Sequence, residues 1–345
     1  MAIRLRPLQQ QVIVITGASS GIGLTTARMA AKAGAKLVLG SRNEQALRNL
    51  EQEISAAGGE AIAVVTDVGN EGDCNRLADA AVARFGGFDT WINNAGVSVY
   101  GKLNDVPVED YRRLFETNFW GVVYGSRAAL NVLTKRGGAL INVGSTLSDR
   151  AIPYQGMYCA SKFAVRAFTD SLRMEIEADK LPVSVTLVKP GAIDTPYTEH
   201  ARNYLPNEPK NPPPVYAPET VARAILHACV HPVRDVFVGS SAKTFSVMEK
   251  LAPRMTDRVM EKTMYSQQQS GERSSGRRLD GLYRPGEGGR ERGNYNGYVM
   301  RHSFYTTATL HPFAAAAIFG LLGLATAAVL GTELAREPRK QTVGL

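Results

Sequence analysis

A short apolar run near the start of the chain leads directly into a glycine-rich turn. Residues 11–15 (Gln-Val-Ile-Val-Ile) have the β-branched, apolar composition typical of a strand buried on both faces. The turn contains Gly17, Gly21 and Gly23, and a helical pattern follows over residues 24–33. This order directs the free N–H groups and the dipole of a helix N-terminus at a diphosphate, and glycine permits close ligand approach. A glycine turn that binds no ligand is the alternative.

The second predicted strand suggests which nucleotide such a site takes. Residues 36–40 form this strand, and Ser41 and Arg42 follow it with no carboxylate nearby. An NAD site usually has Asp or Glu there to bind the ribose 2′-hydroxyl, whereas a guanidinium suits the 2′-phosphate of NADP. We therefore expect NADP(H), and a merely solvated Arg42 is the alternative.

Tyr158 and Lys162 lie four residues apart, thirteen residues after Ser145. Side chains at this spacing share one helix face. A cation favours phenolate over phenol, and lowering a tyrosine pKa from about 10 to about 7 needs roughly 4 kcal/mol. The pair suggests an enzyme that moves a proton to or from a carbonyl or alcohol oxygen, although a Tyr-x-x-x-Lys pair alone can arise by chance.

Short apolar strands alternate with helical stretches as far as residue 242, which predicts an α/β, doubly wound parallel sheet of the Rossmann type. The sixth and last strands are expected at 184–188 and 235–239. Between them, residues 195–218 are rich in Pro and Tyr. We assign residues 1–244 to one NADP-binding catalytic domain.

These features together resemble the short-chain dehydrogenase/reductase family from about Val12 to Ala242. The family's TGxxxGIG, NNAG and PGxxxT motifs correspond to residues 16–23, 93–96 and 190–195. The resemblance implies that residues 195–218 form a substrate lid and that Asn118, Ser145, Tyr158 and Lys162 are the catalytic set. It also implies cofactor contacts from Gly17, Ser19, Ser20, Gly21, Ile22, Gly23, Ser41, Arg42, Asp67, Val68, Asn94, Ala95, Gly96, Tyr158, Lys162, Pro190, Gly191, Ile193 and Thr195.

The resemblance also implies a role for each catalytic residue. Tyr158 would be the general acid in reduction and the general base in oxidation. Lys162 would lower the phenol pKa and bind the nicotinamide ribose. Ser145 would orient the carbonyl and stabilise charge on its oxygen. Asn118 would hold a water that connects Lys162 to solvent. A relative that binds cofactor without catalysing a reaction is the alternative.

The sequence beyond the resemblance divides into four segments. Residues 245–266 predict a helical extension, in which residues 245–264 have one apolar helical face. Residues 267–312, rich in Gly, Ser, Arg and Glu, predict a flexible basic linker. Residues 313–332 carry no charge, and a helix of this length spans about 30 Å, so we expect a transmembrane helix. Its many alanines also suit a helix buried in an interface. A basic tail at 333–345 completes the chain.

The charge pattern agrees with a membrane location. The net charge is +8, and residues 251–301 hold ten Lys or Arg against six Asp or Glu, which favours anionic headgroups. Residues 1–10 show no separate hydrophobic region, so we expect no secretion signal and a catalytic domain on the cytoplasmic side. No nucleic-acid-binding pattern accompanies the basic segment.

The cysteines and histidines give no metal-ligand spacing, so no metal is expected. The scattered thiols of Cys74, Cys159 and Cys229 suggest packed side chains in a reducing compartment. The histidines are His200, His227, His231, His302 and His311, and His200 lies in the expected lid.

We therefore expect an NADP(H)-dependent oxidoreductase that interconverts a small-molecule, lipophilic ketone or aldehyde and its alcohol. A reductase of carrier-bound 3-oxoacyl groups and a non-catalytic, NADPH-sensing membrane scaffold are the alternatives. The resemblance implies a homodimer or homotetramer that pairs through the helices carrying Asn118 and Tyr158.

Overall fold

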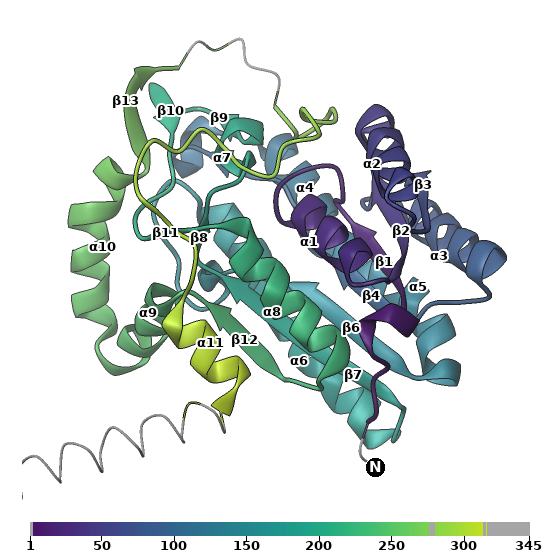
Figure 1. Cartoon of the computed structure of the whole chain (residues 1–345). Coiled ribbons are helices and arrows are strands. Elements are labelled where there is room, and N and C mark those ends of the chain that lie inside the picture. Colours follow the sequence, from purple (N-terminus) through teal and green to yellow (C-terminus); the bar gives the residue numbers. More distant parts are fainter. Residues whose placement is uncertain (1–2, 275, 277–279, 313–314, 316–345) are drawn as a thin grey trace, which may run out of the picture.

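The computed structural model describes residues 3–274, 276, 280–312 and 315. Its central sheet has seven strands in the order β12-β7-β6-β4-β1-β2-β3, and all neighbours are parallel. These strands are β1 (Val12–Thr16), β2 (Lys36–Ser41), β3 (Ala61–Val65), β4 (Thr90–Asn93), β6 (Gly138–Val143), β7 (Val183–Pro190) and β12 (Asp235–Val238). Helices cover both faces of the sheet (Figure 1), which confirms the predicted doubly wound α/β fold.

The side chains of β1 point alternately into two apolar cores. Ile13 and Ile15 join a cluster with residues of α1, α2 and α8. Val12 and Val14 join another cluster with residues of α3, α5 and α6. Successive side chains of a strand face opposite sides of a sheet, so an apolar run serves both layers. The helices are α1 (Gly21–Lys32), α2 (Glu44–Ala56), α3 (Glu71–Phe85), α4 (Val108–Phe115), α5 (Gly121–Arg136), α6 (Gly156–Ala178), α7 (Tyr197–His200) and α8 (Pro218–Val230).

The carboxyl ends of the central strands meet at one edge of the sheet. β1, β2, β4, β6 and β7 end at Thr16, Ser41, Asn93, Val143 and Pro190. The segment after each end carries one of the motifs found in the sequence. Ligands of open α/β sheets bind at such an edge, so this arrangement brings the motifs together.

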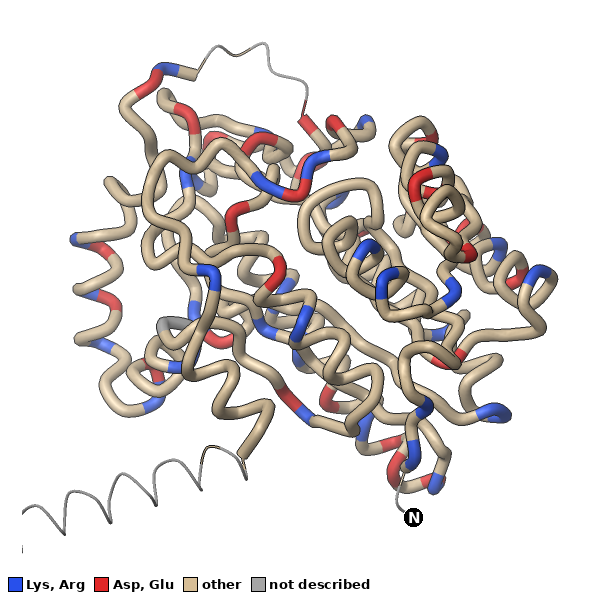
Figure 2. Tube along the Cα trace, viewed as in Figure 1, with Lys and Arg blue, Asp and Glu red and all other residues tan. Residues whose placement is uncertain are grey.

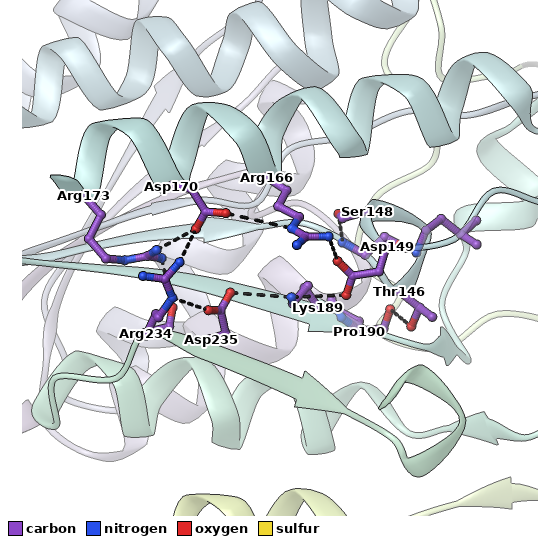
Figure 3. A network of polar contacts seen from close by, with 12 residues as sticks. Thr146, Ser148, Asp149, Arg166, Asp170, Arg173, Lys189, Pro190, Arg234 and Asp235 are labelled. Atoms are coloured by element: carbon purple, nitrogen blue, oxygen red, sulfur yellow. Dashed lines mark hydrogen bonds and ion pairs between the residues drawn. The ribbon is translucent and has the colours of Figure 1, made fainter. Parts of the chain in front are cut away.

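Six charged side chains of alternating sign form a closed ring beside β7 (Figure 3). In order around the ring they are Asp149, Arg166, Asp170, Arg234, Asp235 and Lys189. Lys189 Nζ lies 3.2 Å from Asp149 and 3.6 Å from Asp235, and the Lys189 side chain is only 6 % exposed. The ring therefore joins the segment after β6 to α6, β7 and β12.

The chain after β12 packs against the sheet domain. Two helices, α9 (Ser240–Leu251) and α10 (Pro253–Gln267), occupy the expected helical extension. Arg150 pairs with Glu249 of α9 and, at 2.7 Å, with Asp257 of α10. Further on, β13 pairs with β10 and β14 with β11. The bounds are β10 (Asn207–Pro209), β11 (Val215–Tyr216), β13 (Gln269–Arg273), β14 (Val299–Met300) and α11 (Phe304–Leu310).

The structure differs here from the flexible linker expected at residues 267–312. Leu282 has no exposed surface. Gly281 N–H donates to the carbonyl of His200 at 2.7 Å, and Ala217 N–H donates to the carbonyl of Met300 at 2.9 Å. The described parts of this segment are joined to the rest of the protein by backbone hydrogen bonds and ion pairs, which need few large aliphatic residues.

The expected membrane span at 313–332 lies, apart from Ala315, outside the described residues, as does the basic tail at 333–345. Across the residues that are described, no helix has the length and apolar character needed to cross a membrane.

Three histidines gather where α8 meets α11. The ring centre of His227 lies 4.4 Å from that of His231 and 5.4 Å from that of His311. Burial, and then the neighbouring imidazoles, lower the pKa of His227 to about 4, so this ring is neutral at pH 7. Within the described part of the chain, no three His, Cys, Asp or Glu side chains are placed to hold a metal ion.

The charge ring leads to a stability prediction. Lys189→Met leaves the buried Asp149 and its neighbour Asp235 without their shared cation, so we expect a loss of about 3–5 kcal/mol in the free energy of unfolding. Urea denaturation measures this loss. Lys36→Met is the matched control, because Lys36 is also a strand lysine but its ion pair with Glu60 is half exposed; it should cost about 1 kcal/mol or less. If Lys189→Met lowers the free energy of unfolding no more than Lys36→Met does, the ring does not stabilise the fold.

Candidate active site

The glycine turn after β1 packs too tightly for side chains. Gly17 has a φ of +68°, and a Cβ there would lie 2.8 Å from Cα of Ala95. A Cβ on Gly23 would lie 2.2 Å from the carbonyl oxygen of Gly17. Asn94 also fixes the turn, because its side-chain amide donates to the carbonyl of Thr16 at 2.9 Å. These contacts hold the start of α1 against the end of β4.

A cavity of about 190 Å³ lies over this turn. Most of the residues predicted to contact a cofactor line it, namely Gly17, Ser19, Ser20, Gly21, Ile22, Ser41, Arg42, Asp67, Val68, Asn94, Ala95, Gly96 and Thr195. Gly23 lines neither this cavity nor the neighbouring one, and its role is the close packing described above. His200 of the expected lid also lines the cleft.

Arg42 and Asp67 both have partners in this cleft. The Arg42 guanidinium donates to the carbonyl oxygens of Gly281 and, at 3.1 Å, Leu282. Burial lowers the pKa of Arg42, although the nearby Asp67 carboxylate opposes this shift. Asp67 forms an ion pair of 2.5 Å with Arg113. The sequence interpretation missed Arg113, because no motif marks a residue that acts from α4.

A second cavity, of about 430 Å³, contains the predicted reaction centre. Ser145, Tyr158 and Lys162 all line it, and so do the predicted cofactor contacts Pro190, Gly191 and Ile193. Both cavities share Ile22, Asn94, Gly96, Thr195 and Tyr197 in their walls. The two cavities are therefore parts of one cleft along the carboxyl edge of the sheet.

Ser145 stands at the end of β6, where it caps a short turn. Its Oγ accepts a hydrogen bond from the backbone N–H of Leu147 at 3.0 Å. The hydroxyl can therefore still donate its own proton to an oxygen in the cavity.

Burial shifts the pKa values of Tyr158 and Lys162 in opposite directions. It raises the pKa of Tyr158 to about 12, and hydrogen bonding with Tyr197 and Ser145 opposes this rise. It lowers the pKa of Lys162 to about 8. The Lys162 ammonium donates to the carbonyl of Val143 at 3.0 Å and lies 5.8 Å from the centre of the Tyr158 ring. Burial is the largest cause of the shift at Tyr158, and the lowering of the phenol pKa expected from Lys162 stays a prediction.

Asn118 lies behind the cavity rather than in its wall. It belongs to a π-helical turn, Glu116–Trp120, and is fully buried. Its side chain accepts from Val97 N–H at 2.8 Å and donates to Ser161 Oγ at 3.2 Å. Asn118 thus joins the NNAG loop to the helix that carries Tyr158.

The far wall of the 430 Å³ cavity comes from outside the family motifs. The proline run 212–214 contributes to it, together with Phe245 of α9 and Val259, Met260 and Met264 of α10. The sequence interpretation gave residues 245–264 an apolar helical face but did not connect that face with the reaction centre.

The cysteines are buried thiols, and burial raises the pKa of Cys159, beside Tyr158, to about 11.

Residues 11–205 match the short chain dehydrogenase family. An uncharacterized oxidoreductase of Bacillus subtilis, YxnA, is 51% identical over 329 residues, which are 94% of this chain and 92% of YxnA. Because 329 residues exceed the expected catalytic domain, this similarity extends into the C-terminal part.

Two solved structures share the fold. An alcohol dehydrogenase from Thermococcus sibiricus, complexed with 5-hydroxy-NADP, has a TM-score of 0.59 and 28% identity, over 66% of this chain and 95% of that one. A short chain dehydrogenase/reductase from Burkholderia phymatum, in complex with NAD, has a TM-score of 0.65 and 26% identity, over 78% and 100%.

Proposed function

The chain belongs to the short chain dehydrogenase family and is an oxidoreductase, and on that premise we propose that it interconverts a lipophilic ketone or aldehyde and its alcohol with NADP(H). The observation that carries this proposal is the gathering of Ser145, Tyr158 and Lys162 in one cavity that continues into the glycine cleft. A non-catalytic, NADPH-sensing scaffold needs the glycine cleft but has no need for these three side chains beside it.

The residues of the cleft fit a nicotinamide dinucleotide. Thr195 approaches the glycine turn so closely that a Cβ on Gly21 would lie 3.1 Å from its Cβ. The first turn of α1 can bind a diphosphate, and Arg42 supplies a cation at the end of β2. We assign the adenosine end to the 190 Å³ cavity and the nicotinamide end to the cavity that holds Tyr158.

The proposed chemistry divides between cofactor and protein. A bound nicotinamide supplies or accepts the hydride. Ser145 donates a hydrogen bond to the substrate oxygen, and the Tyr158 hydroxyl gives that oxygen its proton during reduction. With a pKa of about 12, the phenol is protonated at neutral pH and ready to donate. Lys162 fixes a positive charge beside the phenol through its hydrogen bond to Val143.

The far wall of the cavity supports a lipophilic substrate. Phe245, Val259, Met260 and Met264 contribute apolar side chains to the lining of the cavity that holds Tyr158. Methionine is flexible and adapts its shape to apolar ligands. Burial of each additional methylene group contributes about 0.8 kcal/mol, so this wall should favour long or bulky carbon skeletons over short ones.

Tyr158→Phe should lower kcat about 10²–10⁴-fold, because it removes the proton donor while leaving the ring. NADPH oxidation by purified protein over a series of ketones and aldehydes measures this loss, and kcat/KM should rise with chain length. Alcohol oxidation, which needs the phenolate, should increase with pH toward the pKa of about 12. Tyr124→Phe, on a ring that stacks on Trp120, is the control. Equal activity in the two variants would exclude Tyr158 as the acid, and a decline with chain length would contradict the lipophilic substrate.

We propose that Arg42 binds the 2′-phosphate of NADP(H). Loss of a charge-assisted hydrogen bond costs about 1.5–3 kcal/mol, so Arg42→Ala should raise the Michaelis constant for NADPH roughly 10–100-fold and leave that for NADH unchanged. Arg48→Ala, on an exposed ion-paired residue of α2, is the control. Equal effects of Arg42→Ala on both cofactors would remove Arg42 from the phosphate site.

We also propose that residues 313–332 anchor the protein to a membrane, with the catalytic domain on the cytoplasmic side. Their uncharged sequence supports this proposal. Deletion of residues 313–345 should move the protein from the membrane pellet to the supernatant without loss of activity on a water-soluble ketone. The deletion keeps α11, whose Thr306 Oγ1 accepts from Gly239 N–H at 3.0 Å. A truncated protein that still sediments with membranes would contradict the anchor.

A further inference from the structure

Residues 280–293, which we call the strap, lie beside the glycine turn that leads into α1 (Figure 1). The strap lies outside the family domain, and no motif marks it. Four of its residues, Gly281, Pro285, Gly286 and Glu287, line the 190 Å³ cavity together with the glycine turn. The strap therefore forms a wall of this cavity.

The first part of the strap is anchored at the adenosine side of the cleft. Leu282 is fully buried in a cluster that includes Val97 and Leu114. Its carbonyl accepts from Arg42 at 3.1 Å and from Arg113 Nε at 3.2 Å. Two guanidinium groups of the cleft thus bind the same strap carbonyl.

The middle of the strap is hydrogen-bonded to the glycine turn. Gly289 N–H donates to the carbonyl of Ser19 at 2.8 Å, and Gly21 N–H donates to the carbonyl of Arg290 at 2.9 Å. The approach is close, because a Cβ on Gly288 would lie 2.2 Å from Cβ of Ala46. Only glycine fits at position 288 while the strap is in place.

The last part of the strap is held by ion pairs on the opposite side, where residues of both charge signs meet (Figure 2). Arg290 pairs with Glu199 at 2.6 Å, and Arg292 pairs with Glu219 at 2.7 Å. Gly293 N–H donates to Asp194, in the PGxxxT segment, at 3.2 Å. The strap therefore connects the β2 end, the glycine turn and the PGxxxT segment, which are the three sides of the cleft.

We propose that the strap is part of the dinucleotide-binding site and that a bound nicotinamide dinucleotide lies beneath it. This inference rests on the proposed function, because it takes the ligand of the cleft to be that cofactor. The dinucleotide can leave only after the strap detaches from the glycine turn. The strap therefore sets the rate of cofactor exchange, and residues from the C-terminal part of the chain determine cofactor affinity.

Two variants detach the strap in different ways. Gly288→Val puts a side chain where Ala46 leaves no room, and the double variant Arg290→Ala/Arg292→Ala removes the ion pairs at the far end. Gly271→Val is the matched control, because a Cβ on Gly271 meets nothing within 4 Å. The full-length chain is used throughout, and circular dichroism checks that each variant is folded.

The dissociation rate of NADPH is measured from the change in NADPH fluorescence after excess NADP⁺ is added. We expect dissociation to be at least tenfold faster in both strap variants and unchanged in the control. Hydrogen exchange in the wild-type protein should slow across residues 280–293 when NADPH is added.

Unchanged dissociation in both strap variants would overturn the inference while leaving the proposed function intact. Tighter NADPH binding in these variants, with faster exchange of residues 280–293 on NADPH addition, would also overturn it, because the strap would then be a plug that the cofactor displaces. Failure of the wild-type chain to bind either NADPH or NADH would overturn the proposed function and this inference together.

Discussion

Burial of a parallel sheet on both faces determines where this protein can do chemistry. The strands satisfy their backbone groups within the sheet and give their side chains to two apolar cores. Polar and glycine-rich segments are then confined to the ends of the strands. All the predicted motif segments follow carboxyl ends of central strands, so they share one edge, and the cleft forms there.

Two buried lysines have different roles because their neighbours differ. Lys189 lies between the carboxylates of Asp149 and Asp235 and serves the architecture. Lys162 has a backbone carbonyl as its partner, and burial lowers its pKa to about 8, so its charge responds to small changes nearby. The first lysine stabilises a charged arrangement, and the second supplies a cation that is not already neutralised by a carboxylate. Lys189 lies on β7 and Lys162 on the neighbouring α6. The charge ring can therefore stabilise the elements around the reaction centre without neutralising the charge of Lys162.

The parts of the molecule that could be predicted from the sequence are those whose residues form short sequence motifs. Gly17 and Gly23 are needed because of contacts within a few residues or with the adjacent strand end, and Tyr158 and Lys162 are one helical turn apart. The charge ring could not be predicted, because Lys189 meets partners about forty residues away on either side. The strap could not be predicted either, since it is held by backbone hydrogen bonds, which leave no trace in composition, and by ion pairs with residues distant in the sequence. The same applies to the apolar wall from α10, whose periodicity predicts a buried face but not what that face covers. The burial that raises the pKa of Tyr158 could not be predicted, because sequence reveals the neighbouring cation but not the depth of burial.

The position of the strap in the chain has a consequence for how the protein is made. Protein synthesis proceeds from the N-terminus, and domains fold as units while it continues. All seven sheet strands end by Val238, so they leave the ribosome well before the strap at residues 280–293 does. A nascent chain can therefore complete its sheet with the cleft still uncovered. The strap is added after the sheet is complete, and under the proposed function a nucleotide present at that moment can be enclosed beneath it.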